Sequence, residues 1–187
     1  FSVSSQRYPF VESAFLKLLQ ESEASFYKYT INECPMDTII DEVRDSHSNL
    51  GVIFINSTTR RVLESILKKN ELQFETLAEI TPGIYLSKKH PLLRESSITM
   101  EDLCRYPFLS YKQNDGVAMD FSEEFQVPAY SSIPQRILVS DRSSAIRILS
   151  ETLAFSTGSG LLDPALDEGI VTLPLESSQT IRIGWIH

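Results

Sequence analysis

The sequence is short of glycine, of positive charge and of long apolar segments, and each shortage excludes a class of protein. Seven glycines and nine prolines among 187 residues exclude a collagen-like or low-complexity chain. No apolar run approaches the ~20 residues of a membrane-spanning helix, so we predict no membrane contact. The formal net charge of −8 repels phosphate groups, so this chain by itself is predicted not to bind nucleic acid.

Cysteine and histidine are scarce as well. The two cysteines, Cys34 and Cys104, have no metal-binding spacing, which favours free thiols in a reducing compartment and leaves a disulfide open. The three histidines, His47, His90 and His187, have no second ligand at i+2 to i+4, so no zinc site is predicted. We find no nucleophile elbow, P-loop or GxGxxG motif, and therefore predict no cofactor, no catalytic residue and no enzyme activity.

What the sequence does contain is a repeated alternation of strand and helix patterns. Its 42% hydrophobic content suffices for one core or for two small lobes. Runs with strand composition occur at residues 1–6, 26–31 and 50–55. Apolar residues at the spacing of one helix face follow each run, after Pro9, after Pro35 and after the cap candidates Ser57, Thr58 and Thr59. This order predicts a doubly wound α/β fold with parallel strands.

A second series of the same kind follows in the other half of the chain. Residues 97–103 and 118–125 are predicted as short helices or turns, and Asp141 as the cap of a longer helix. The predicted strands are residues 108–111, 137–140, 153–156, 171–173 and 181–186. Pro82-Gly83 interrupts the strand-like residues 72–86 and is compatible with a turn or a kink. Two α/β lobes are the expected result, with a ligand at the carboxyl ends of the strands.

Polar residues follow the predicted strands of the first half, where helices begin. They are Ser4, Ser5, Gln6 and Arg7, then Cys34 and Thr38, and then Asn56, Ser57 and Thr58. Helix N-termini carry unpaired N–H groups and partial positive charge, so we predict that this set binds an anion such as a carboxylate. Arg7 could add a bidentate contact. The alternative is that Ser57 or Thr58 is only a helix cap and that Arg7 points into solvent.

Polar residues also follow the strands of the second half. We predict ligand contacts from Tyr111, Gln113, Asn114 and Thr157, with Asp115, Ser156 and Ser159 nearby. Their hydroxyl and amide groups suit the orientation of a ligand rather than catalysis. The alternative for Asn114 and Asp115 is an ordinary Asn-Asp-Gly surface turn.

Cys34 supports one further hypothesis. A thiol at a helix N-terminus can have a lowered pKa, because the dipole stabilises the thiolate. Cys34 is therefore a candidate redox sensor, which a Cys34→Ser substitution with an unchanged response to peroxide would exclude.

Several segments, in this order and spacing, resemble one known family. They are FSVSSQRYPF, LGVIFI, LSKKHPLLRESSITMEDLCRYPFLSY, EGIVTLPL and IRIGWIH. Together they are similar to the effector-binding (regulatory) domain of LysR-type transcriptional regulators over nearly the whole chain. The resemblance gives added weight to Ser4, Ser5, Gln6 and the loop after Tyr111 as effector contacts.

The resemblance implies a fold like that of periplasmic binding proteins, with two Rossmann-like lobes joined by two crossover strands. Lobe I would comprise residues 1–88 plus 168–187 and lobe II residues 89–167, with the first crossover entering lobe II at His90-Pro91. The family's N-terminal winged helix-turn-helix is not in this sequence, so DNA binding would depend on that separate domain. The chain begins without Met, and we expect further sequence upstream, as well as a C-terminal helix beyond His187.

The resemblance also implies partners and a location. We expect a small-molecule effector between the lobes, a side-by-side antiparallel homodimer, a tetramer of the full-length protein, and the bacterial cytoplasm. A periplasmic or extracellular solute-binding protein is the alternative, because it shares the two-lobe architecture. An upstream signal peptide would favour that alternative.

Overall fold

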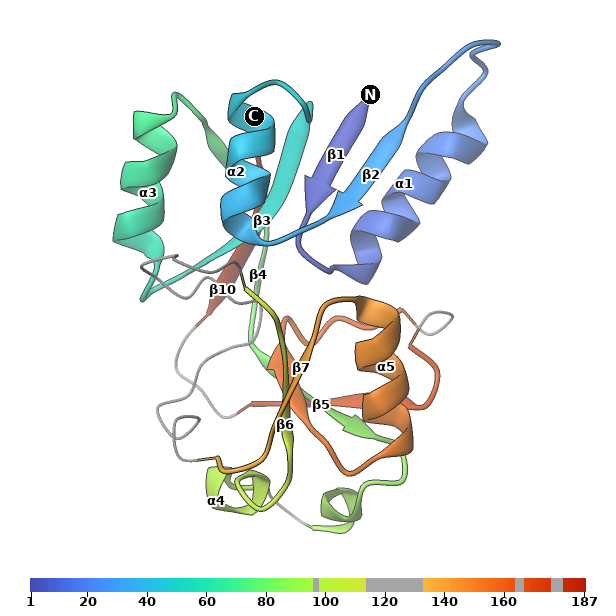
Figure 1. Ribbon diagram of the computed structural model, residues 1–187, viewed down its shortest axis with the longest axis vertical. Helices are drawn as coiled ribbons and strands as arrows, with labels where there is room; N and C mark the ends of the chain where they lie inside the picture. The colour runs from blue at the N-terminus through green and yellow to red at the C-terminus, as the bar shows by residue number, and fades with distance from the viewer. Residues whose placement is uncertain (96–97, 114–132, 164–166, 176–179) are drawn as a thin grey trace. The chain divides into compact units, whose positions relative to one another are not determined.

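The computed structural model describes residues 1–95, 98–113, 133–163, 167–175 and 180–187 (Figure 1). These residues form two compact units. Unit 1 contains residues 1–80 and the C-terminal strand β10 (Ile181–Ile186), and unit 2 contains the described residues from Thr81 to Leu175. The chain therefore passes from unit 1 to unit 2 after Ile80 and returns before β10. The Pro82-Gly83 dipeptide lies directly after the first of these passages.

Unit 1 is built on a five-stranded sheet in the order β2-β1-β3-β10-β4. Its strands besides β10 are β1 (Ser2–Ser5), β2 (Thr30–Glu33), β3 (Leu50–Asn56) and β4 (Phe74–Ile80). Strand β1 pairs in parallel with β2 and β3, whereas β10 pairs antiparallel with β3 and β4. The carboxyl ends of β1, β2 and β3 consequently lie at one edge of the sheet.

The helices of unit 1 are α1 (Pro9–Glu21), α2 (Met36–Arg44) and α3 (Arg60–Lys69). Pro9 is the first residue of α1, where its missing N–H costs no hydrogen bond. Helix α2 approaches β3 closely at Gly51, because a β-carbon there would lie 2.5 Å from Cγ2 of Ile39. The close approach buries Ile39 completely and fixes α2 against the sheet that carries the predicted site.

Unit 2 contains a three-stranded and a two-stranded sheet. In the first, β5 (Gly83–Ser87) pairs antiparallel with β8 (Ser156–Gly158) and β9 (Ile170–Pro174). In the second, β6 (Phe108–Tyr111) runs parallel to β7 (Arg136–Val139). Two backbone hydrogen bonds join the sheets, from Leu109 N–H to the Phe155 carbonyl and from Phe155 N–H to the Pro107 carbonyl.

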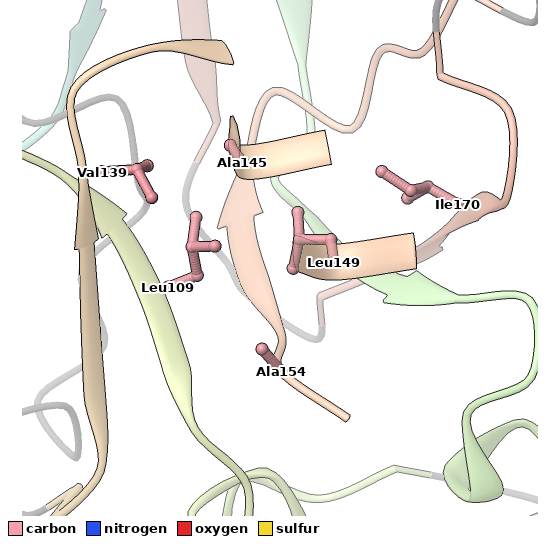
Figure 2. Close-up of a cluster of buried hydrophobic side chains, with 6 residues drawn as sticks. All are labelled: Leu109, Val139, Ala145, Leu149, Ala154 and Ile170. Atoms are coloured by element: carbon pink, nitrogen blue, oxygen red, sulfur yellow. The ribbon is translucent and has the colours of Figure 1, made fainter. Parts of the chain in front are cut away.

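One long helix covers the core of unit 2. Helix α5 (Arg142–Glu151) follows β7, and its residues Ala145 and Leu149 are buried. Figure 2 shows these two side chains pointing toward residues from the surrounding strands and connections, namely Leu109, Val139, Ala154 and Ile170. Two short helices, η1 (Pro91–Arg94) and α4 (Met100–Leu103), complete the described elements of this unit.

The corner at His90 is a buried structural contact inside unit 2. The ring of His90 is 2% exposed, and its Nδ1 accepts the Leu92 N–H at 3.2 Å. Its Nε2 must then carry the proton, which it donates to the Leu153 carbonyl at 3.2 Å. Burial lowers the pKa of His90, so the neutral ring is the stable form. The residue caps η1 and ties it to the end of α5.

Several predictions of elements and boundaries differ from the structure. The predicted lobe boundaries at 88/89 and 167/168 enclose β5 and β9 in lobe I, but both strands pair in the sheet of unit 2. The chain therefore enters unit 2 before the His90-Pro91 corner, contrary to the prediction. The strand predicted at 153–156 begins at Ser156. The prediction for residues 118–125 lies outside the described residues.

The aromatic run before β2 is also different from its prediction. Residues 26–31 have strand composition, but β2 begins at Thr30 and Phe26 is 93% exposed. Tyr27 instead stacks on Tyr29 with centroids 4.7 Å apart, and Tyr29 also packs edge-on against Phe1 and Phe15, each at 6.4 Å. Aromatic strand propensity depends on packing partners in a sheet, and here Tyr27 and Tyr29 find ring partners outside a strand pair.

None of the helices in the described ranges has the length and apolarity to span a bilayer. Both cysteines are free thiols, as the composition favoured, so the disulfide left open by the sequence is not formed.

Candidate functional site

The predicted site residues of unit 1 lie at the carboxyl edge of its parallel strands. Ser5 ends β1, Cys34 directly follows β2, and Asn56 ends β3. The register places Ser5 opposite both Glu33 and Val52, so β3 continues past the end of β1. Backbone topology thus brings three segments that are far apart in sequence to one edge of the sheet.

Ser4 and Ser5 are fully buried in this edge. The Ser4 hydroxyl shares a 2.7 Å hydrogen bond with that of Ser48, and it also bonds the Cys34 thiol. The carbonyl of Ser5 accepts the Cys34 N–H at 3.0 Å. Ser4 therefore links the end of β2 to the segment that leads into β3, a structural role that sequence reasoning did not separate from ligand contact.

The environment of Cys34 is the opposite of the one predicted. Burial, with a smaller contribution from the Glu42 carboxylate, raises the pKa of the Cys34 thiol to about 11. Arg7 and the hydrogen bond with Ser4 lower the pKa but do not offset burial. The prediction of a lowered pKa was wrong because the desolvation of the thiolate outweighs the helix dipole. The redox hypothesis for Cys34 loses its basis, since a protonated thiol reacts slowly.

Gln6, Arg7 and Thr38 complete the predicted set on this side. Gln6 is buried, its N–H bonds the Val52 carbonyl at 3.2 Å, and its Oε1 accepts the Tyr8 hydroxyl at 3.4 Å. Arg7 is half-buried and close enough to Cys34 to influence the thiol, so its side chain does not extend wholly into solvent. Thr38 is half-buried in the first turn of α2.

Asn56 forms the turn that begins α3. Its Oδ1 accepts the N–H groups of Thr58 and Thr59 at 2.9 and 2.8 Å, and the Thr59 hydroxyl at 3.0 Å. Asn56 thus holds the turn that leads into α3 rather than the first amides of the helix itself. Of the predicted cap candidates Ser57, Thr58 and Thr59, Thr59 takes the N-cap position, but its side chain makes no capping hydrogen bond. Ser57 and Thr58 are exposed.

Unit 2 has an equivalent edge. Tyr111 ends β6, Val139 ends β7, and β8 contains the buried Thr157. Tyr111 and Gln113 are half-buried, and the Gln113 amide donates to the Tyr111 carbonyl at 3.4 Å. The predicted contacts Asn114 and Asp115 lie outside the described residues.

Sequence reasoning missed Tyr85, which lies among apolar residues of β5. Its phenol oxygen accepts the Gly160 N–H at 2.8 Å and shares a 3.1 Å hydrogen bond with the Ser159 hydroxyl. Burial raises the pKa of Tyr85 to about 12. The signal available in the sequence was a single aromatic hydroxyl in the apolar run Ile84 to Leu86, together with a glycine-rich loop after β8.

Sequence reasoning also missed a buried ion pair in unit 2. The Arg142 Nη2 donates to Oδ1 of Asp167 at 2.8 Å, and the two side chains are 10% and 3% exposed. The second oxygen of Asp167 accepts the Asp163 N–H at 2.7 Å. No sequence pattern indicates this pair, because 25 residues separate its members.

The described ranges contain no cluster of three His, Cys, Asp or Glu side chains that could hold a metal ion. The polar groups described at the two edges are hydroxyls, amides, the Cys34 thiol, an arginine in each unit and, in unit 2, the carboxylates of Asp141 and Asp167. Such groups bind and orient a polar ligand.

Comparisons with known proteins place this geometry in one family. The LysR substrate binding domain model matches residues 15–186. No curated protein matches the chain by sequence.

Solved structures agree with the family match. The effector-binding domain of QuiR in complex with shikimate is 11% identical, with a TM-score of 0.60 over 99% of this chain and 85% of that domain. The reduced OxyR regulatory domain from Pseudomonas aeruginosa is 15% identical, with a TM-score of 0.61 over 100% of this chain and 86% of that domain. A full-length OxyR variant from the same organism is 15% identical, with a TM-score of 0.63. The match covers 100% of this chain and 59% of the OxyR chain.

These matches confirm the predicted fold, an α/β architecture like that of periplasmic binding proteins. The family match also favours a regulator domain over the solute-binding protein considered as the alternative. The chain belongs to the LysR substrate binding domain family, the ligand-sensing domain of LysR-type transcriptional regulators.

Proposed function

We propose that this domain binds a small anionic metabolite, a carboxylate, at the carboxyl ends of the parallel strands in its two units. The observation that supports this proposal is that both units end their parallel strands in polar side chains that include an arginine, Arg7 in one and Arg142 in the other. QuiR, which has a similar fold, is described in complex with shikimate, a carboxylate.

We assign two different roles to the predicted site residues. Ser57, Thr58, Tyr111, Gln113 and Asn114 are proposed contacts, together with Arg7, Thr38 and Thr157. Ser4, Ser5, Gln6, Cys34 and Asn56 are proposed to hold the edge of unit 1 in place, because hydrogen bonds within the unit engage each of them. Donors and acceptors fixed in this way lose little entropy when a ligand binds.

The proposed output is a change in DNA binding by a separate N-terminal domain. The chain passes twice between its units, so a ligand that contacts both has different affinities for different arrangements of them. That difference is the free energy available to shift the regulator between two states. We further propose a homodimer, a tetramer of the full-length protein, a cytoplasmic location and no catalysis by this domain.

Thermal unfolding with a panel of small carboxylates tests the binding proposal. A ligand at 100 times its Kd should stabilise the fold by about 2.7 kcal/mol. For a domain of this size that corresponds to a rise in Tm of about 5–10 °C. Chloride at equal ionic strength is the control, and a panel without any stabilising member contradicts the proposal.

Substitutions locate the bound ligand. Gln113→Ala and Thr58→Ala should weaken binding of the active carboxylate, because both residues are proposed contacts. Thr76→Ala is the matched control, since Thr76 is an exposed residue of β4 and outside both edges. Equal affinity of all three variants would mean that the ligand binds elsewhere.

A further inference from the structure

The buried ion pair of unit 2 lies at the carboxyl edge of the sheet, where the proposed function places the ligand. Arg142 is the first residue of α5 and follows the end of β7 by three positions. The cap of the helix is a different residue, because Asp141 accepts the Ser144 N–H at 2.8 Å. Arg142 is therefore not needed to begin the helix.

The position of Arg142 favours a carboxylate beside it. The N-terminus of a helix has partial positive charge, so a guanidinium there increases an already positive potential. Asp167 supplies the compensating negative charge at 2.8 Å. Removal of the carboxylate from a buried ion pair is strongly destabilising, so a group that displaces Asp167 has to bring a negative charge of its own to Arg142.

Other polar groups surround the pair. The charges of Arg142 and Asp167 both act on the phenol of Tyr85, which in turn bonds Ser159 and Gly160. A hydroxyl and a guanidinium within one buried cluster are the groups that recognise a hydroxylated carboxylate. The Arg142 side chain is 10% exposed and the Asp167 side chain is 3% exposed. The guanidinium is therefore the more accessible partner.

Asp167 also belongs to the segment that leads the chain back to unit 1. Its N–H donates to the Asp163 carbonyl at 2.8 Å, and its own carbonyl accepts the Ile170 N–H at 3.2 Å. Ile170 is the first residue of β9, after which the chain returns to β10 in unit 1. Release of the Asp167 side chain would therefore free the start of the return segment.

We propose that Asp167 is an internal substitute for the effector, and that an effector carboxylate takes its place on Arg142. The proposal rests on the proposed function and specifies how that site is regulated. The exchange replaces one carboxylate by another, so Arg142 remains paired throughout while Asp167 moves into water. The free-energy difference between the state with Asp167 on Arg142 and the state with the effector on Arg142 is then small. Ligand binding is therefore sufficient to shift the population from the first state to the second.

Acetate, the simplest carboxylate, is the probe for the exchange. In the 187-residue chain, Asp167→Asn removes the competing charge while keeping the side-chain volume. We expect this variant to bind acetate at least tenfold more tightly than the wild type, measured by calorimetry against chloride at equal ionic strength. The gain should disappear in the double variant with Arg142→Gln. Asp45→Asn is the matched control, because Asp45 pairs with Arg44 on the exposed surface.

Equal acetate affinity of Asp167→Asn and the wild type would overturn the proposal, as would a gain that survives the loss of Arg142. If Asp167→Asn does not fold, amide hydrogen exchange of the wild type tests whether acetate displaces Asp167 from Arg142. The Asp163 amide, which donates to Asp167, should exchange at least tenfold faster in saturating acetate than in chloride. Unchanged protection of that amide would equally overturn the exchange.

The outcomes separate this inference from the proposed function. If a metabolite carboxylate binds the wild type with the same affinity after Arg142→Gln, the domain is still a sensor but the exchange is wrong. If no carboxylate of the panel binds the wild type while Asp167→Asn gains acetate binding through Arg142, the site exists and the sensing proposal fails.

Discussion

The two units have the same strand arrangement but different chemistry at the corresponding edge. In unit 1 the order is β2-β1-β3-β10-β4, and in unit 2 the hydrogen bonds give β7-β6, then Phe155 and β8, then β5-β9. In each unit an antiparallel strand, β10 or β5, lies beside three parallel segments. The edge of unit 1 is held by neutral hydroxyl and amide hydrogen bonds, whereas that of unit 2 is held by a buried ion pair.

This difference teaches that topology fixes where a site can be, while individual side chains fix what it can bind. Loops after parallel strands converge in both units because the backbone direction requires it. Charged residues begin helices in both units, but Arg60 at the start of α3 is exposed, whereas Arg142 at the start of α5 is buried in an ion pair with Asp167. Removal of the carboxylate from a buried pair is costly, so the edge of unit 2 depends more on charge for its stability. Substitutions that each remove one side-chain interaction test whether the two edges differ in this way.

The largest effect is expected from the ion pair. Asp167→Ala should reduce the free energy of unfolding by about 3–5 kcal/mol, because the buried Arg142 would lose the carboxylate that lies 2.8 Å from it. Arg60→Gln in unit 1 removes an exposed pair with Glu64 and should cost about 0.5 kcal/mol or less. Urea unfolding of both variants measures the difference. Similar losses would show that the two edges do not differ in their dependence on charge.

Side chains that hold the entry to a helix should give matched, smaller effects in the two units. Asn56→Ala removes the acceptor of the Thr58 and Thr59 N–H groups in the turn before α3, and Asp141→Ala removes the acceptor of the Ser144 N–H in α5. Each should cost about 1 kcal/mol in urea unfolding. A much larger loss for Asn56→Ala than for Asp141→Ala would mean that the Asn56 turn supports more than its helix.

Acidification should weaken unit 2 through His90. Burial lowers the pKa of His90 below its usual 6.5, so the unfolded chain takes up a proton at a higher pH than the folded one. Stability from the neutral ring is therefore complete above pH 6.5 and is lost as the pH falls from 6.5 through the lowered pKa. His90→Gln should flatten this part of the profile of unfolding free energy against pH. A wild-type profile that is level below pH 6.5 would contradict this role of the ring.

The last prediction concerns Cys34, where little effect on stability is expected. The quantity measured there is the reactivity of the thiol. With a pKa of about 11 instead of 9.0, the thiolate fraction near neutral pH is about a hundredfold below that of an ordinary thiol. In a Cys104→Ser background, iodoacetamide should label Cys34 slowly and faster as the pH approaches 11. Rapid labelling at pH 7 would restore the redox hypothesis.

Much of the fold could be predicted from local pattern. The helices after Pro9 and Pro35 and the buried strand β3 begin and end close to the predicted residues, because apolar periodicity and caps are properties of short segments. The strand predicted from Phe26 begins only at Thr30, because Phe26 is exposed and Tyr29 packs on Tyr27, Phe1 and Phe15 instead of in a strand pair. The boundaries between units depend on strand pairing, which is not a local property.

For the candidate site, the sequence predicted which segments meet but not how their side chains are bonded. The segments around Ser5, Glu33 and Asn56 do lie at one edge of unit 1, because parallel strands end there together. Only the packed structure shows that Ser4 and Asn56 bond residues of their own unit and that burial raises the pKa of Cys34.

The sequence by itself determined the α/β class, the order of strands and helices, and the segments that carry polar residues, because these follow from the spacing of side chains along the backbone. The tertiary structure decided that β5 and β9 belong to unit 2, that Tyr85 bonds the loop after β8, and that Arg142 meets Asp167. Such contacts join residues 25 or more positions apart, and their strength depends on burial, which only the packed fold sets.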